Sequence, residues 1–169
     1  YPKELFDYIA SLVNGFESAW DCASGNGQAA ISLAKIFENV SASDVSREQI
    51  ENSFSKENIE YSVQPSECTN YRDNQFDLIN VAQALHWFDY GQYWDEVARI
   101  LKPDGVFVAY SYSWSTVDAA IDEIVDNQIK KIIEPYWASN NKLAWDGYKS
   151  VEFPFERLFT PNIGLVNEW

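Results

Sequence analysis

The chain has 169 residues, of which 46% are hydrophobic. A chain of this length and composition can bury one hydrophobic core, so we predict a single domain over residues 1–169. Its formal charge of -14 at pH 7 argues against nucleic acid as a partner, because the phosphates would be repelled. No apolar run approaches the roughly 18 residues of a membrane span and no signal-peptide pattern opens the chain, so we expect a cytoplasmic protein with no membrane partner. Cys22 and Cys68 form no C-x-x-C pair and His86 is the single histidine, so we expect no metal site.

The predicted elements alternate between strands and helices, which favours an α/β fold: a mostly parallel sheet with helices on both faces. A capping box, Ser46-x-x-Gln49, begins a short helix. A further helix, with apolar residues from Tyr93 to Leu101, must end before Pro103, and Pro103–Gly105 is expected to form a turn. In chain order, the other expected elements are a strand at Ser18–Trp20, a helix at Gln28–Phe37, and strands at Asn39–Asp44, Ile59–Val63, Phe76–Val81 and Val106–Tyr110.

The pattern changes after Tyr112. Isoleucines and a valine from Ile121 to Ile133 recur at helical spacing and predict an amphipathic helix that ends before Pro135. Aromatic residues crowd the stretch that follows. We interpret residues from about 114 to 150 as a helical and aromatic insertion that folds over the carboxyl edge of the sheet. One more strand is predicted at Glu152–Phe159.

The most informative stretch runs from Trp20 to Ala30. A strand leads into Asp21 and a loop of small residues with the pattern Gly25-x-Gly27-x-x-Ala30, and a helix follows. Glycines let such a turn approach a ligand closely, and a helix N-terminus offers free N–H groups. Asp44 ends the next strand 17 residues after Gly27, close to the roughly 20-residue spacing at which an acid binds a ribose in βαβ nucleotide sites. Together these features predict an adenosine-containing cofactor.

Asp21 distinguishes between the two main cofactor classes. An acid at the loop would repel the pyrophosphate of a dinucleotide, whereas the ammonium and sulfonium groups of S-adenosylmethionine are cationic and suit it. The sequence therefore favours S-adenosylmethionine over NAD(P).

These motifs resemble class I S-adenosylmethionine-dependent methyltransferases, in particular type 11 and trans-aconitate methyltransferase-like proteins. Ala23 stands where the family usually has glycine. The resemblance also implies an N-terminal segment and a final helix and strand that this chain lacks, so we expect the C-terminal part of the fold to be incomplete. The chain contains no methionine, which likewise suggests an internal fragment or missing residues. The resemblance rests on Trp20–Gln28, Ala42–Ser46, Gln64–Glu67, Phe76–Ile79, Ala82–Asp89 and Arg99–Gly105.

The resemblance assigns roles to individual residues. The backbone of Ala23, Ser24 and Gly25 would line the methionyl part of the cofactor, and Asp44 would accept the ribose hydroxyls. Residues expected to bind the cofactor are Asp21, Ala23, Ser24, Gly25, Gly27, Asp44, Val45, Ser46, Ser66, Glu67, Gln83 and Ala84, with Ser66 and Glu67 at the adenine edge. Asp44 could instead be a solvated strand-end acid, and Glu67 an ordinary surface acid.

His86 and Trp87 follow the fourth strand, where the methyl group should lie. His86 is the candidate catalytic residue, because the ordinary pKa of histidine lies near neutral pH and its imidazole can take a proton. Trp87 is the candidate substrate contact. Both could instead pack in the core. The expected reaction is methyl transfer to a small-molecule acceptor, possibly a carboxylic acid, leaving S-adenosylhomocysteine. An NAD(P)-dependent oxidoreductase and a non-catalytic cofactor-binding protein are the alternatives. The sequence leaves the acceptor's identity and the oligomeric state open.

Overall fold

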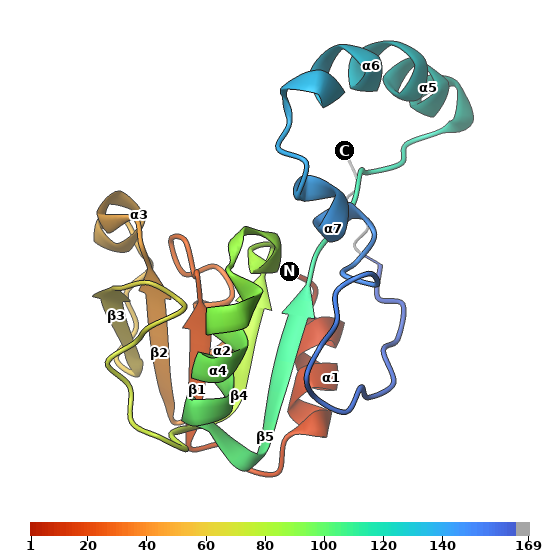
Figure 1. Cartoon of the computed structure of the whole chain (residues 1–169). Helices are drawn as coiled ribbons and strands as arrows, with labels where there is room; N and C mark the ends of the chain where they lie inside the picture. The colour runs from red at the N-terminus through yellow and green to blue at the C-terminus, as the bar shows by residue number, and fades with distance from the viewer. Residues whose placement is uncertain (165–169) are drawn as a thin grey trace.

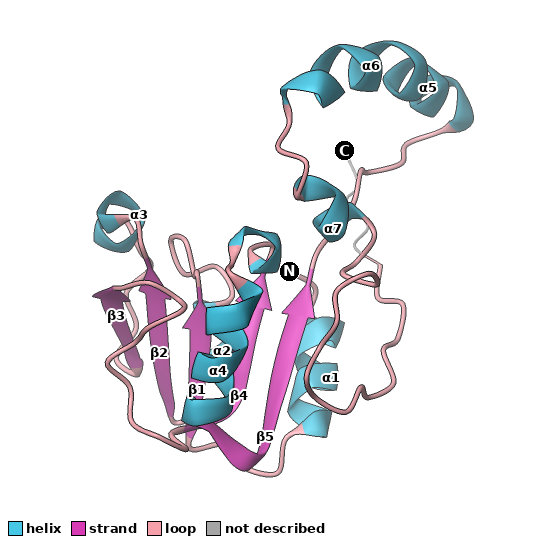
Figure 2. Cartoon of the chain, viewed as in Figure 1, coloured by secondary structure: helices cyan, strands magenta, loops and turns pink. Residues whose placement is uncertain are grey.

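The computed structural model describes residues 1–164, so the last five residues of the predicted domain lie outside the described part. Five strands form one parallel sheet in the order β3-β2-β1-β4-β5 (Figures 1 and 2). The strands are β1 (Ser18–Cys22), β2 (Asn39–Asp44), β3 (Ile59–Val63), β4 (Phe76–Ala82) and β5 (Leu101–Tyr110). The mostly parallel α/β sheet predicted from the sequence is confirmed.

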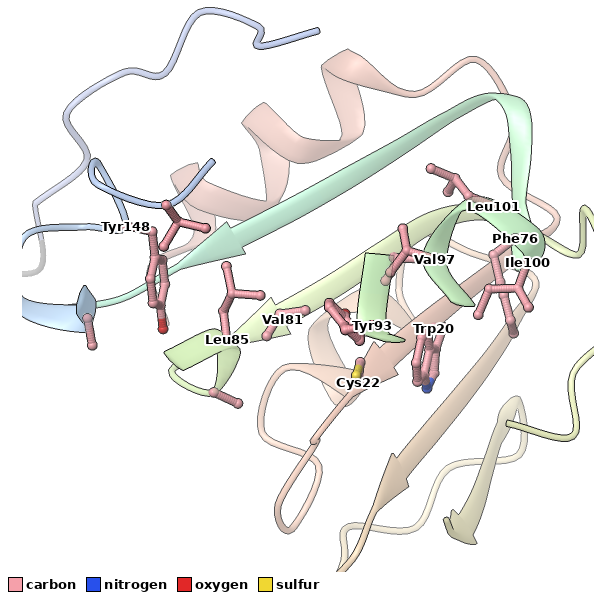
Figure 3. Packing of buried hydrophobic residues seen from close by; sticks show 14 residues of the cluster. Trp20, Cys22, Phe76, Val81, Leu85, Tyr93, Val97, Ile100, Leu101 and Tyr148 are labelled. Carbon is pink, nitrogen blue, oxygen red and sulfur yellow. The ribbon is translucent and has the colours of Figure 1, made fainter. Parts of the chain in front are cut away.

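Helices cover both faces of the sheet. The alternation of side chains along β1 sends Ala19 to one face and Trp20 to the other, where the two residues join separate cores. The helices α1 (Lys3–Leu12) and α2 (Ala30–Leu33) pack on the Ala19 face, and α4 (Tyr90–Ile100) packs on the Trp20 face (Figures 1 and 2). Figure 3 shows the second core, in which Tyr93 and Val97 of α4 lie over Trp20 and Val81. The remaining elements of this part are α3 (Arg47–Glu51) and the short η1 (Leu85–Trp87).

Local signals account for the ends of several elements. Ser46 caps α3, with its hydroxyl accepting from the Gln49 N–H at 3.3 Å, as the capping box predicts. Asp89 caps α4 by accepting from the N–H groups of Gly91 and Gln92. The strand predicted at Ile59–Val63 forms with those bounds.

Two local predictions are wrong in detail. Of the helix predicted over Gln28–Phe37, only the four residues of α2 form an α-helix. Hydrogen bonds that span three residues, such as Lys35 N–H to Ser32 C=O at 3.2 Å, interrupt the α-helical pattern and form tighter turns there. The turn predicted at Pro103–Gly105 lies inside β5 as a bulge. Leu101 pairs with Phe76 and Val106 with Leu78, so four residues oppose Asp77 alone.

The predicted insertion after β5 contains short helical elements, in line with the helical spacing of its isoleucines. A π-helical turn, η2 (Val125–Ile129), joins α5 (Ala119–Ile124) to α6 (Lys130–Ile133), and η3 (Glu134–Tyr136) and α7 (Asn141–Trp145) follow. The expectation that it folds over the sheet needs correction. Figure 1 shows α5 and α6 standing away from the sheet, and Ile121 and Ile132 of the apolar face are 43% and 67% exposed. Among the described residues, α7 and its neighbours lie near the carboxyl ends of β4 and β5, where Asn140 Nδ2 donates to the His86 carbonyl and Ser111 Oγ to the Ala144 carbonyl.

The strand predicted at Glu152–Phe159 does not form, although these residues are described. Phe153 and Phe155 nevertheless share one side, because both rings pack against Trp94 and Phe107 at centroid distances of 5.4–6.3 Å. The alternation in the sequence reflects this packing of the two rings, which the described chain achieves without a neighbouring strand.

Candidate cofactor site

The chain order of the strands reverses between β1 and β4. In open α/β sheets the crevice at the carboxyl ends of such a pair is the usual place for a ligand. A pocket of about 350 Å³ opens at this place. It is lined by Tyr1, Asp21, Ala23, Ser24, Gly25, Asn26, Gln28, Ala29, Gln49 and Ala82.

The loop after β1 has an unusual backbone. Ala23, Gly25 and Gly27 have φ values of 54°, 55° and 88°, in the left-handed region that favours glycine. At Ala23 this left-handed conformation costs about 1–2 kcal/mol of conformational free energy, which glycine would avoid. Ala23 nevertheless adopts it at the edge of the pocket. Gly27 is not among the lining residues. A Cβ there would lie 2.1 Å from the Tyr61 hydroxyl oxygen, so the missing side chain makes room for a residue of β3.

Asp44 ties this loop to the end of β2. Its Oδ2 accepts from the Gly25 N–H and its Oδ1 from the Ser46 N–H, both at 2.9 Å. Each carboxylate oxygen keeps capacity for a second hydrogen bond, so these contacts leave room for a ribose diol. Val45, next to it, is 70% exposed and offers an apolar surface beside the acid.

Asp21 is fully buried at the base of the pocket. It stands directly opposite Asn80 of β4, whose Nδ2 donates to Asp21 Oδ1 at 2.7 Å. Among the described residues Asp21 Oδ2 has no hydrogen-bond partner. Burial raises the pKa of Asp21 from its ordinary 3.8 to about 7, against the opposing effects of the hydrogen bond from Asn80 and of the nearby Ala30 backbone N–H. A carboxylate in this position gains strongly from a cationic ligand.

Other buried polar atoms near Asp21 also have no partner within the described part of the chain. They are Asn80 Oδ1, Gln83 Nε2 and the Tyr110 hydroxyl, at the carboxyl ends of β4 and β5. Each such atom costs about 1–3 kcal/mol, and folded proteins seldom leave several together. Gln83 is in addition held at φ 59°. The hydroxyls of Tyr71, Tyr90 and Tyr93, elsewhere in the described chain, are unpaired as well. Asn80 bonds Asp21 directly and Gln83 follows the lining residue Ala82, so part of this unpaired polar surface borders the pocket and favours a polar ligand there. The buried acid suits the ammonium of S-adenosylmethionine.

The residues predicted for the adenine edge lie further off. Ser66 is buried and Glu67 half-buried in the loop after β3, and Glu67 Oε1 accepts from the Asp89 N–H at 3.2 Å. Neither is among the lining residues of the pocket. The structure therefore joins Asp21, Ala23, Ser24 and Gly25 in one pocket and connects Asp44 and Ser46 to it by hydrogen bonds.

Gln83, Ala84, His86 and Trp87 follow β4 in a tight stretch. His86 Nδ1 lies 3.2 Å from the Tyr148 hydroxyl, and the His86 carbonyl accepts from Asn140 Nδ2 at 2.7 Å. Burial lowers the pKa of His86, so the imidazole is neutral at pH 7. The Trp87 ring packs on His86 at 4.8 Å and is 58% exposed.

Sequence reasoning missed several residues of this site. Asn80 carried a readable signal, since it is a polar residue in the middle of the apolar run Phe76–Ala82. Tyr1, Tyr110 and Tyr148 carried none, because aromatic residues are abundant along the chain and their proximity depends on the fold. The other lining residues not predicted are Asn26, Gln28, Ala29, Gln49 and Ala82.

A family model described as a methyltransferase domain matches residues 20–109. The chain belongs to this family, the class I S-adenosylmethionine-dependent methyltransferases. A Dictyostelium discoideum protein named as a methyltransferase is 32% identical over 169 residues, covering 98% of this chain and 64% of the relative. A type II methyltransferase structure from Anaeromyxobacter dehalogenans superposes with a TM-score of 0.87 at 34% identity, covering 95% of this chain and 68% of that one.

A more distant relative carries a different name. The mouse mitochondrial protein NDUFAF5, named an arginine hydroxylase, is 28% identical over 121 residues, covering 68% of this chain and 34% of its own length. This chain thus spans less than two thirds of both curated relatives. Within residues 1–164, no helix is long and apolar enough to cross a membrane, and no group of three or more His, Cys, Asp or Glu side chains is placed to hold a metal ion.

Proposed function

We propose that this protein transfers a methyl group from S-adenosylmethionine to a small-molecule acceptor, with residues 1–169 forming a single methyltransferase domain. The observation that carries the proposal is the buried carboxyl of Asp21, which has one oxygen without a partner among the described residues, at the pocket in the β1–β4 crevice. A ligand ammonium would supply the missing partner and favour the ionised form of the acid. A pyrophosphate would instead meet a negative charge, which disfavours the nicotinamide dinucleotides.

The remaining residues of the site hold the cofactor in this proposal. Asp44 accepts the ribose hydroxyls while its bonds to Gly25 and Ser46 keep the loop in place. The backbone of Ala23, Ser24 and Gly25 lines the methionyl end, and Gln83, Ala84, Ser66 and Glu67 take the more distant contacts assigned by the family resemblance.

The bound cofactor supplies a sulfonium methyl, which is a strong electrophile. The protein's main task is then to position the acceptor, an effect worth roughly 7–11 kcal/mol in well-oriented reactions. The neutral His86 imidazole is available to take a proton from a hydroxyl or amine acceptor, and a carboxylate acceptor needs no base. The family resemblance favours a small carboxylic acid as acceptor, with Trp87 contacting it.

Two free thiols, the buried Cys22 and the exposed Cys68, are compatible with the reducing cytoplasm that we propose as the location.

The decisive experiment compares ligands by thermal stability. S-adenosylhomocysteine at 100 times its dissociation constant should add about 2.7 kcal/mol to the free energy of unfolding, and NAD should add nothing. Stabilisation by NAD alone would overturn the proposal and support the oxidoreductase alternative.

A screen of metabolites with methyl-labelled cofactor then tests catalysis. Transfer of label to an acceptor supports the proposed reaction. The name of the NDUFAF5 relative makes hydroxylation a useful comparison, so products should also be examined for added oxygen. Cofactor binding without transfer to any acceptor would favour a non-catalytic binding protein.

A further inference from the structure

A second pocket, of about 420 Å³, lies within the insertion, between the end of α6, η3 and α7. Figure 1 shows these elements above the carboxyl ends of β4 and β5. The pocket is lined by Lys131, Glu134, Pro135, Trp137, Ala138, Ser139, Lys142 and Trp145. Its volume is within the range of small-molecule sites, which is roughly 300–1,000 Å³.

Two indole rings, tilted by 48° to one another, form an apolar wall of this pocket. Trp137 and Trp145 both line it, with ring centroids 4.8 Å apart. Trp114 stacks on Trp137 at 5.1 Å and an interplanar angle of 24°, and Lys130 Nζ lies 4.9 Å from the centroid of the Trp114 ring. These contacts hold the Trp137 ring in place, so a ligand in the pocket can pack against it without much loss of side-chain freedom.

The charge of the pocket is opposite to that of the chain. Lys131 and Lys142 line it, and Glu134 is the one lining acid, 3.9 Å from Lys142. Among the eight lining residues two are lysines and one is an acid, although the whole chain carries a formal charge of -14. Since a lysine-lined wall repels a cation, an aromatic cage for an ammonium ligand is disfavoured.

We propose that this pocket binds a planar aromatic carboxylate. The ligand ring packs against the indoles of Trp137 and Trp145. Its carboxylate pairs with the ammonium groups of Lys131 and Lys142, partly replacing Asn127 as the partner of Lys131 and Glu134 as the partner of Lys142. This site goes beyond the proposed function, because it belongs to the insertion and requires no cofactor.

Isothermal titration of the whole chain with 2-naphthoate tests the proposal, with 2-naphthamide as the neutral analogue of the same shape. The naphthoate should bind at least tenfold more tightly than the amide. Lys131→Gln and Lys142→Gln should each weaken naphthoate binding severalfold, and the double variant at least tenfold. Lys149→Gln removes the same charge from the insertion outside the pocket and should leave the affinity unchanged.

Equal binding of acid and amide, an affinity unaffected by the double variant, or an equal loss in Lys149→Gln would each overturn the proposal. Trp145→Phe keeps an aromatic ring and should weaken both ligands alike. Circular dichroism and thermal melting of every variant establish that the fold is intact. Because no cofactor is added, a negative result leaves the methyltransferase proposal standing, and a failure of S-adenosylhomocysteine to bind leaves this one standing.

Discussion

Replacing Asp21 with asparagine should stabilise the protein at pH 8 while weakening cofactor binding. The pKa of Asp21 in the folded chain is raised to about 7 from its ordinary 3.8. Between these values the folded state holds a proton that the unfolded state has released, so the stability contributed by Asp21 falls as pH rises from about 4 to 7. At about 1.4 kcal/mol for each pKa unit, the loss reaches about 4 kcal/mol above pH 7.

The amide introduced by Asp21→Asn cannot ionise, so the variant escapes this loss. Its carbonyl oxygen can still accept from Asn80 Nδ2, but its own NH₂ then stands where Asp21 Oδ2 has no partner. An unpaired buried donor costs about 1–3 kcal/mol, which leaves a net gain of about 1–3 kcal/mol at pH 8.

The measurement is urea unfolding of the parent chain and of Asp21→Asn at half-unit steps from pH 4 to pH 9. The difference in free energy between the two should change by about 4 kcal/mol across pH 4–7 and stay constant above. In parallel, the affinity for S-adenosylhomocysteine should fall at least tenfold in the variant, because the amide cannot pair with an ammonium. If the difference in unfolding free energy does not vary with pH, the assignment of Asp21 as a buried acid with a raised pKa is refuted. If the affinity for S-adenosylhomocysteine is unchanged in Asp21→Asn, Asp21 does not belong to the cofactor site.

Further substitutions test Asp44, Gly27 and His86 together with their contacts. Asp44→Ala removes two hydrogen bonds that hold the loop, so it should cost about 2 kcal/mol of stability in urea unfolding as well as cofactor affinity in titration calorimetry. Gly27→Ala should destabilise the chain by about 2 kcal/mol through its positive φ and its contact with Tyr61, and adding Tyr61→Phe should recover part of the loss in a double-mutant cycle. His86→Ala should lower turnover about 10²-fold with cofactor affinity unaltered, and Tyr148→Phe should shift the pH profile of turnover.

Each change has a result that would contradict its reasoning. A stable Asp44→Ala chain would mean that the loop holds its shape without the carboxylate. Additive effects of the Gly27 and Tyr61 substitutions would show that the two positions do not interact. Full turnover in His86→Ala would leave this histidine as a packing residue.

The sequence predicted strands better than it predicted the elements between them. Ile59–Val63 and the apolar run from Phe76 could be read because an alternating or continuous apolar pattern reports burial directly. Pro103–Gly105 was misread as a simple turn. It lies inside β5 opposite Asp77 of the neighbouring strand, whose carboxylate accepts from Lys102 Nζ at 2.9 Å, and this contact between strands cannot be read from the local sequence.

The same distinction holds for the site. The sequence placed Asp21, the small-residue loop and Asp44 near one another, since they are joined by a single strand–helix–strand unit. It could not show that Asp44 holds the loop, because Gly25 N–H reaches the carboxylate only after β1 and β2 pair.

Taken alone, the sequence determined the α/β class, the loop at the end of the first strand and the kind of cofactor that an acidic loop suits. Only the tertiary structure decided that Asn80 stands against Asp21, that Tyr148 reaches His86, and that Lys131 and Lys142 share a pocket with two tryptophans. Local periodicity reports which side of an element is buried. Residues about 60 positions apart come together because of the order of the strands and the packing of the insertion. Neither of these can be read from the residues that lie between them in the sequence.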